Sequence, residues 1–209
     1  MKRLGLFLCL VFGAVAIGIA PPFSGVALAQ APIKVGVIGP FKLTPGRDIQ
    51  EAATMAVEEI NAAGGVLGRK LLLVFAETEQ SPEKGKTAVE RLLFVDKVDV
   101  IIGEHRTEVA LAVQPIIMEN KKIFLSTGTG SPLLSENVLK DYAKYKYYFR
   151  TFLNSNQMAK QMVKQLDDML ATNKMARVAI VAETAVWLEP IVEALKASLG
   201  PKLVATERV

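Results

Sequence analysis

Cysteine and histidine are almost absent from this chain of 209 residues, which has one of each, Cys9 and His105. A single thiol cannot form an intramolecular disulfide, and one histidine with one cysteine is a poor ligand set for zinc. Positive charge exceeds negative charge only slightly, because the formal net charge is +4, and no basic cluster is present. The sequence therefore predicts no metal site and no cofactor, and it argues against nucleic acid as a partner.

The signatures of common enzymes are lacking as well. No nucleophile-elbow sequence is present to place a serine beside His105. The glycine-rich run Gly128-Thr129-Gly130-Ser131 lacks the Gly-Lys-Ser/Thr ending of a P-loop. It also lacks the Gly-x-Gly-x-x-Gly spacing of a dinucleotide site. We predict that the chain is not an enzyme.

A long run without charge is present at the N-terminus. Two basic residues precede the apolar stretch 4–20, and Ala27-Leu28-Ala29 then offers the small-x-small pattern that signal peptidase requires. We predict that residues 1–29 are a cleaved signal peptide, which takes Cys9 with it. A retained membrane anchor is the alternative, but the stretch 4–20 is short for a spanning helix of roughly 20 residues.

After the leader, β-branched runs alternate with segments that have apolar residues at helical spacing. The first pattern predicts strands and the second predicts helices. The predicted strands are 33–38, 70–76, 98–103 and 122–126, and the predicted helices are 48–62, 81–94 and 108–119. This alternation indicates an α/β fold with a parallel, doubly wound sheet, in which ligands bind at the carboxyl ends of the strands.

Three of the helix ends carry recognisable signals. Asp48 is predicted to be the N-cap of the first helix, with Glu51 completing a capping box, and Gly64 is predicted to end it. Ser81 and Pro82 are predicted to start the second helix.

Residues 131–151 interrupt the alternation. We predict a loop that leads to a short strand over 147–150, which leaves the first lobe for the second. The tyrosines of this stretch are interpreted as half-buried strand aromatics, with a partner surface as the alternative.

The alternation then resumes in what we predict is a second lobe. The predicted elements are a helix over 156–171, a strand over 177–181, a helix over 187–199 and the beginning of a strand over 202–206. We predict a first lobe over 30–150 and an incomplete second lobe over 151–209. One βαβ unit cannot bury both faces of a sheet, so we expect either a partner that completes it or a longer parent chain.

Two loops after strands, and one aromatic residue, are candidates for ligand contact. The loop 103–107 precedes a helix, whose N-terminal N–H groups and dipole favour an anion. Thr107 is predicted to be its cap or a ligand hydroxyl, and Arg106 to pair with a ligand carboxylate or to remain solvated. The turn 128–131 is either purely structural or an anion-binding turn. Trp187 either covers a ligand or packs at the start of a helix.

Four stretches in this order resemble the branched-chain amino acid-binding proteins of ABC transporters, the leucine/isoleucine/valine-binding group within the type I periplasmic binding fold. They are IKVGVIGP (33–40), EINAAGGVLGRK (59–70), IIG (101–103) and LSTGTGSP (125–132), and the resemblance covers 33–209. It implies two α/β lobes, joined by crossover strands, that close on a ligand by hinge motion.

The resemblance also implies which residues touch the ligand. Residues after the third and fourth strands hold the α-carboxylate and ammonium of an amino acid in this family. Gly130 stands where the family often has a hydroxyl residue, so a neighbour is expected to supply that hydrogen bond. An acidic residue that commonly binds the ammonium lies beyond Val209. The predicted ligand-binding residues are Thr107, Gly128, Thr129, Gly130, Ser131 and Trp187.

The function implied by the resemblance is that of a periplasmic substrate-binding component of an ABC transporter. Its ligand is expected to be an amino acid of the branched-chain type or a similar small polar metabolite, and its partner a membrane permease. The alternative is a sensory module of the same fold that recognises amides, urea or amino acids. Neighbouring permease and ATPase genes would indicate transport. We expect these residues alone to bind weakly or not at all.

Overall fold

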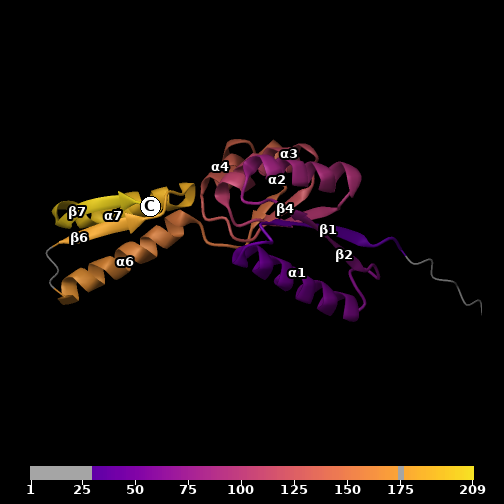
Figure 1. The fold of residues 1–209 in the computed structure, drawn as a ribbon, viewed down its shortest axis with the longest axis horizontal. Helices are drawn as coiled ribbons and strands as arrows, with labels where there is room; N and C mark the ends of the chain where they lie inside the picture. The colour runs from indigo at the N-terminus through magenta and orange to yellow at the C-terminus, as the bar shows by residue number, and fades with distance from the viewer. Residues whose placement is uncertain (1–29, 174–176) are drawn as a thin grey trace, which may run out of the picture.

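The chain forms two separate parallel β-sheets at the two ends of an elongated molecule (Figure 1). The computed structural model describes residues 30–173 and 177–209, so the predicted signal peptide lies outside the described residues. Within that part of the chain, no helix has both the length and the apolar character needed to cross a bilayer.

The first sheet has five strands in the order β2-β1-β3-β4-β5, all parallel. Their register aligns Ile38 with Gly103, Gly103 with Ser126, and Ser126 with Arg150, so four strands end at one edge. Chain segments that leave these ends therefore start side by side. The strands are β1 (Ile33–Gly39), β2 (Leu71–Glu77), β3 (Val100–Gly103), β4 (Ile123–Ser126) and β5 (Tyr148–Arg150).

Helices cover both faces of this sheet, which confirms the predicted doubly wound α/β arrangement. Figure 1 shows α1 on one face and α2 and α3 on the other. The helices and helical turns of this part are α1 (Thr44–Ala62), α2 (Pro82–Glu90), the π-helical turn η1 (Arg91–Val95), α3 (Thr107–Glu119), α4 (Leu133–Lys140) and α5 (Tyr142–Tyr145).

Alternate strand residues supply the core on each face, as the period of two along a strand requires. Val35 and Val37 pack with Ala53 of α1 on one face. Ile38 and Ile101 belong to the larger cluster on the other face, with α2, η1 and α3. Each such fully buried aliphatic side chain stabilises the fold by about 1.5–3 kcal/mol.

The predicted start of the first helix was wrong by one turn. Helix α1 begins at Thr44, and its N-cap position is Leu43, with Pro45 in the first turn. Proline is pre-organised for that place and has no N–H to satisfy there. Asp48 and Glu51 therefore lie inside the helix. The predicted end is confirmed, because Gly64 has a φ of 107° directly after the C-cap.

The loop predicted between residue 131 and the short strand was wrong, because this segment contains α4 and α5, whereas the short strand predicted over 147–150 is confirmed as β5. Helix α4 is anchored by buried Leu134, whose carbonyl accepts a hydrogen bond of 2.9 Å from the Gln114 side chain. Strand β5 pairs with β4, so it belongs to the first sheet. The tyrosines of this stretch differ in exposure, because Tyr148 is buried whereas Tyr142 is 69% exposed.

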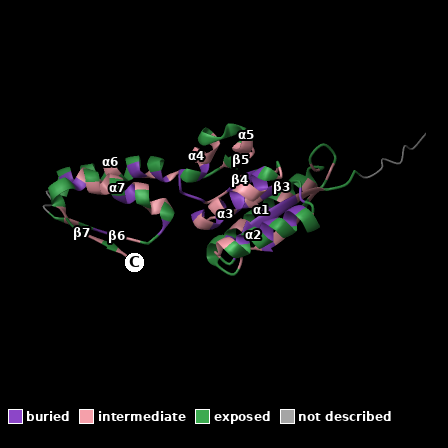
Figure 2. Cartoon of the chain, turned by 90° about the horizontal axis from the view of Figure 1, so that it is seen from above, coloured by how far each residue is buried: buried purple, intermediate pink, exposed green. Residues whose placement is uncertain are grey.

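The second sheet consists of two parallel strands with two helices on one of its faces (Figure 2). Leu170, Ile180 and Val192 belong to its small core, whereas Val181 is 68% exposed on the opposite face. The apolar side expected for the 156–171 helix is only partly covered, because Met162 and Met169 are exposed. The elements are α6 (Ser155–Asn173), β6 (Val178–Ala182), the 3₁₀ turn η2 (Val186–Leu188), α7 (Glu189–Leu199), the 3₁₀ turn η3 (Gly200–Lys202) and β7 (Leu203–Arg208).

Candidate ligand-binding site

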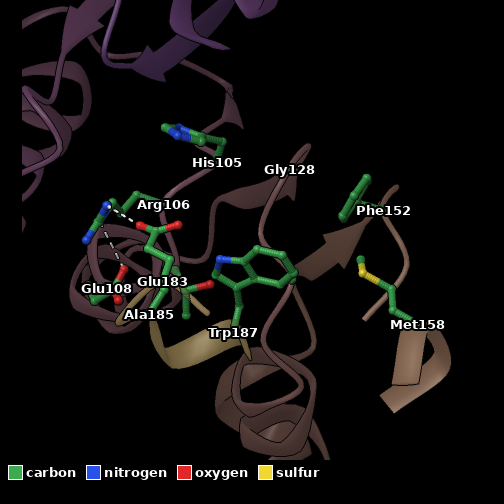
Figure 3. A pocket seen from close by; sticks show the side chains of 11 residues that line it. His105, Arg106, Glu108, Gly128, Phe152, Met158, Glu183, Ala185 and Trp187 are labelled. Atoms are coloured by element: carbon green, nitrogen blue, oxygen red, sulfur yellow. Dashed lines mark ion pairs between the residues drawn. The ribbon is translucent and has the colours of Figure 1, made fainter. Parts of the chain in front are cut away.

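A pocket of about 280 Å³ lies between the two α/β units, at the carboxyl ends of β3 and β4 and beside the loop after β6. Its position agrees with the crevice expected for parallel sheets. Figure 3 shows side chains from both units converging on it. The lining residues are His105, Arg106, Thr107, Glu108, Gly128, Gly130, Phe152, Met158, Glu183, Ala185 and Trp187.

The loop between β3 and α3 has a constrained backbone. Gly103 has a φ of 113°, and a β-carbon on it would lie 2.2 Å from the carbonyl oxygen of Ile38. Only glycine tolerates both conditions. Glu104, the next residue, also has a positive φ, of 62°, which is uncommon for a residue with a side chain. The chain thus turns sharply here and brings His105, Arg106 and Thr107 to the pocket.

The carboxylate of Glu104 stabilises this turn from within. Its Oε1 accepts hydrogen bonds from the N–H groups of His105, at 3.0 Å, and Arg106, at 2.9 Å. The side chain is fully buried, and burial raises the pKa of Glu104, although the two amides offset part of the rise. Burial also lowers the pKa of His105, and the Arg106 cation lowers it further.

Thr107 is the first residue of α3, and Arg106 occupies the N-cap position, so the prediction that Thr107 caps the helix was wrong. The other alternative, a ligand hydroxyl, fits its surroundings. The residue is 1% exposed, and its Oγ1 has no hydrogen-bond partner among the described residues. A buried hydroxyl without a partner is costly, so a hydrogen bond to a bound molecule would stabilise this one. The first N–H groups of α3 have no partner within the helix, so they also favour an anion at this helix end.

The turn 128–131 contributes its two glycines to the pocket. Gly128 and Gly130 line it, whereas Thr129 and Ser131 are buried beside it and do not appear among its described lining residues. The Thr129 hydroxyl is hydrogen-bonded to the hydroxyl of Ser126, and the Ser131 Oγ accepts the N–H of Leu133 at 3.3 Å. The hydroxyls of Thr129 and Ser131 therefore stabilise the turn itself.

Arg150, at the end of β5, holds this turn against the crossover segment. Its guanidinium donates to the carbonyl oxygens of Thr129 and Ser131, the latter at 3.1 Å, and to that of Phe152 at 2.9 Å. Burial lowers the pKa of Arg150. The role of Arg150 could not be predicted from the sequence, because nothing local distinguishes it from an ordinary strand-end arginine.

Trp187 packs directly on Gly130. A β-carbon at Gly130 would lie 3.1 Å from Cε3 of the indole and 3.2 Å from its Cβ. Ser155 ties the two together, because its Oγ donates to the carbonyl oxygen of Gly130 at 2.8 Å and also contacts the carbonyl oxygen of Trp187. Trp187 therefore packs in the turn before α7, as one alternative predicts, and it also lines the pocket, where the other alternative predicts a ligand.

The indole separates a charged end of the pocket from an apolar end (Figure 3). At the charged end, Arg106 Nε lies 3.3 Å from Glu108 Oε2, and Arg106 Nη1 lies 3.7 Å from Glu183 Oε1. At the apolar end lie Phe152 and Met158. Such a site suits a small molecule with one polar and one apolar end. Among the described residues, no cluster of three or more His, Cys, Asp or Glu side chains could hold a metal ion.

The chain matches one protein family and several curated relatives. The family described as "Periplasmic binding protein" matches residues 32–209. The Leu/Ile/Val-binding protein homolog 3 of Brucella melitensis is 29% identical over 175 residues, which are 82% of this chain and 45% of that protein. The chain therefore spans about half the length of the curated relatives it matches.

Solved structures give the same fold. A branched-chain amino acid transporter substrate binding protein from Streptococcus pneumoniae, in complex with isoleucine, has a TM-score of 0.71 and 18% identity, over 85% of this chain and 49% of that one. A solute binding protein of an ABC transporter from Rhodopseudomonas palustris, in complex with 3,4-dihydroxy benzoic acid, has a TM-score of 0.70 and 24% identity, over 86% and 47%.

Proposed function

The chain belongs to the periplasmic binding protein family, and from this premise we propose that it is the substrate-binding component of an ABC transporter. This family consists of binding proteins, so we assign the chain no catalytic step. One observation carries the proposal. Thr107, Gly128, Gly130 and Trp187, which come from segments far apart in the sequence, line one pocket between two α/β units.

The ligand in this proposal is an amino acid of the branched-chain type or a small polar metabolite of similar size. A carboxylate would lie against the N-terminus of α3 and the glycines of the turn 128–131, where N–H groups and the Thr107 hydroxyl offer hydrogen bonds. The apolar part of the ligand would lie toward Phe152 and Met158. The relatives with bound isoleucine and dihydroxybenzoate support a pocket for such small carboxylates.

Residues 30–150 and 151–209 would act as parts of two lobes that move relative to each other. The contacts between Gly130, Ser155 and Trp187 would form as the lobes approach. Closure of this kind removes water from the ligand and creates a surface that a membrane partner can recognise. In this proposal that partner is a permease, the protein works in the periplasm, and residues 1–29 direct its export.

Ligand-observed NMR on the purified chain tests this proposal, because it detects binding even at millimolar dissociation constants. The compounds are leucine, isoleucine, valine, 3,4-dihydroxybenzoate, acetamide and urea. We expect saturation transfer to at least one of them, and we expect that compound to change the fluorescence of Trp187, which is the single tryptophan. The absence of transfer to all six compounds would count against the ligand class proposed here.

A further inference from the structure

Strand β6 has one edge without a hydrogen-bonded neighbour. It pairs in parallel with β7, and no other strand within residues 30–173 and 177–209 pairs with it. The carbonyl oxygen of Ala182 accepts the N–H of Val209, so the even-numbered residues of β6 direct their backbone groups toward β7. Because these directions alternate along a strand, the N–H and C=O groups of Ala179 and Val181 point to the other edge. Such an edge is a template for a further strand.

Apolar side chains border this edge. A groove of about 330 Å³ is lined by all four residues of 178–181 and by side chains of α6 and α7. Consecutive strand residues face opposite sides of a sheet, so a groove that all four line runs along the edge of β6. Met162 and Met169 of α6 also line the groove, and they are 42% and 52% exposed. Exposed apolar surface of this kind beside an unpaired strand indicates a protein interface.

The charges that flank β6 are complementary to each other. The segment 177–183 reads RVAIVAE, so an exposed arginine precedes the strand, an exposed glutamate follows it, and no charge or proline lies between them. When two copies of this segment pair antiparallel about Ile180, Arg177 of one copy lies opposite Glu183 of the second copy, on the same face of the sheet. Opposite charges across a strand pair stabilise it, whereas like charges destabilise it.

The same register suits the backbone and the groove. It places Ala179 opposite Val181 of the second copy as a hydrogen-bonded pair, which uses the groups that point to the free edge. It also brings α6 of each copy toward the twofold axis, where Met162 and Met169 of both copies can cover the two grooves. A pairing with this symmetry is closed, because each copy offers the same surface to the other.

We infer that β6 is the interface of a symmetric homodimer, in which the β6 strands of two copies pair antiparallel and join the two small sheets into one. The second copy is then the partner that the small second unit needs to bury its apolar groove. This inference goes beyond the proposed function, because it concerns the edge of the second sheet and requires no ligand.

Sedimentation velocity on the purified chain without ligand tests the inference. The concentration is raised from micromolar to near-millimolar, since the fraction of dimer depends on the concentration of protomers. We expect the sedimentation coefficient to rise with concentration and to level off at the value of a dimer. A chain that stays monomeric over the whole range, or assemblies that keep growing beyond the dimer, would overturn the inference.

Two proline variants locate the interface. Ala179→Pro removes an N–H that the pairing with β7 does not use and places a ring at the free edge, as edge strands tolerate. We expect this variant to keep its circular dichroism spectrum and to remain monomeric. Thr206→Pro is the matched control on the outer edge of β7, because Val209 directs its N–H toward β6 and Thr206, an odd number of residues earlier, directs its own away. The control should still dimerise, and equal dimerisation of both variants would contradict the assigned edge.

Charge reversal tests the register. Arg177→Glu places two carboxylates opposite each other at both ends of the paired strands, so we expect the dimer dissociation constant to rise about tenfold. Adding Glu183→Arg to this variant restores opposite charges and should restore the dimer. An unchanged dissociation constant in the single variant, or no recovery in the double variant, would overturn the inference. A monomer that still binds a ligand would leave the proposed function standing, and a dimer that binds none would leave this inference standing.

Discussion

Trp187 lies against Gly130 so closely that a β-carbon at Gly130 would be 3.1 Å from Cε3 of the indole. The two residues belong to different α/β units, and Ser155 contacts the carbonyl oxygens of both. The single tryptophan therefore reports on the contact between the units as well as on the contents of the pocket.

Gly130→Ala should force the indole away from the turn. Overpacking of this kind costs about 1–3 kcal/mol, here mainly in the contact between the units. We expect the fluorescence of Trp187 to shift toward longer wavelength as the ring gains solvent, and ligand binding to weaken. In the Trp187→Ala background the same change should cost almost nothing, since the added methyl group no longer meets the ring. Equal effects in both backgrounds would contradict the packing described.

Ser155→Ala should loosen the same contact without adding bulk. The N–H of Ser155 still donates to the Gly130 carbonyl at 2.7 Å, so the change removes only the hydroxyl, whose single proton is shared between the carbonyl oxygens of Gly130 and Trp187. Losing one such hydrogen bond costs about 0.5–1.5 kcal/mol. Urea denaturation should show this loss, and Ser155→Thr should recover part of it. A stability equal to that of the wild type would show that Ser155 does not join the units.

Arg150→Lys should disorder the turn 128–131 although it conserves charge. A lysine cannot reproduce the fork that reaches the carbonyls of Thr129, Ser131 and Phe152. We expect a loss of about 1.5–3 kcal/mol in stability, and faster amide hydrogen exchange at Gly128 and Gly130. Arg177→Lys is the control, since Arg177 lies outside this network. Unchanged exchange at the two glycines would contradict the role assigned to Arg150.

Glu104 should make stability depend on pH. Burial raises its pKa in the folded chain, so the folded state holds the proton more tightly than the unfolded state. The contribution of Glu104 to stability is therefore fully present below the ordinary carboxyl pKa and is lost as the pH rises through the raised value. Glu104→Gln keeps an oxygen acceptor for the N–H groups of His105 and Arg106 but does not titrate.

Urea denaturation of both chains between about pH 4 and pH 7 measures this effect. The free energy of unfolding of the wild type should fall, relative to that of Glu104→Gln, as the pH increases across that window. The difference between the two chains cancels the other titrating groups. A difference that is constant with pH, or one that grows in favour of the wild type, would show that burial does not dominate at Glu104.

The order of strands and helices could be predicted from the sequence because apolar runs such as 33–38 and 98–103 alternate with longer amphipathic segments. Helices α4 and α5 could not, since they have eight and four residues, too few for a clear helical period. They are stabilised by tertiary contacts instead, such as the bond from Gln114 to the Leu134 carbonyl.

Some residues of the site could likewise be predicted from the sequence, and others could not. Thr107, the two glycines and Trp187 follow strands directly, so the rule for parallel sheets places them near one crevice. Arg150 and Ser155 each have a partner that is 19 or more residues away in the sequence. No local pattern marks such residues, and their roles become visible only when the two units are seen together.

Amide chemical-shift mapping by NMR tests whether a ligand binds in the pocket between the two α/β units. The chain is labelled with ¹⁵N and titrated with leucine, and every backbone amide and the Trp187 indole N–H are followed. We predict that the largest shifts occur at Thr107, Gly128, Gly130 and the Trp187 indole, all of which line the pocket between the units. Shifts confined to other parts of the chain, with these four signals unmoved at saturation, would contradict it.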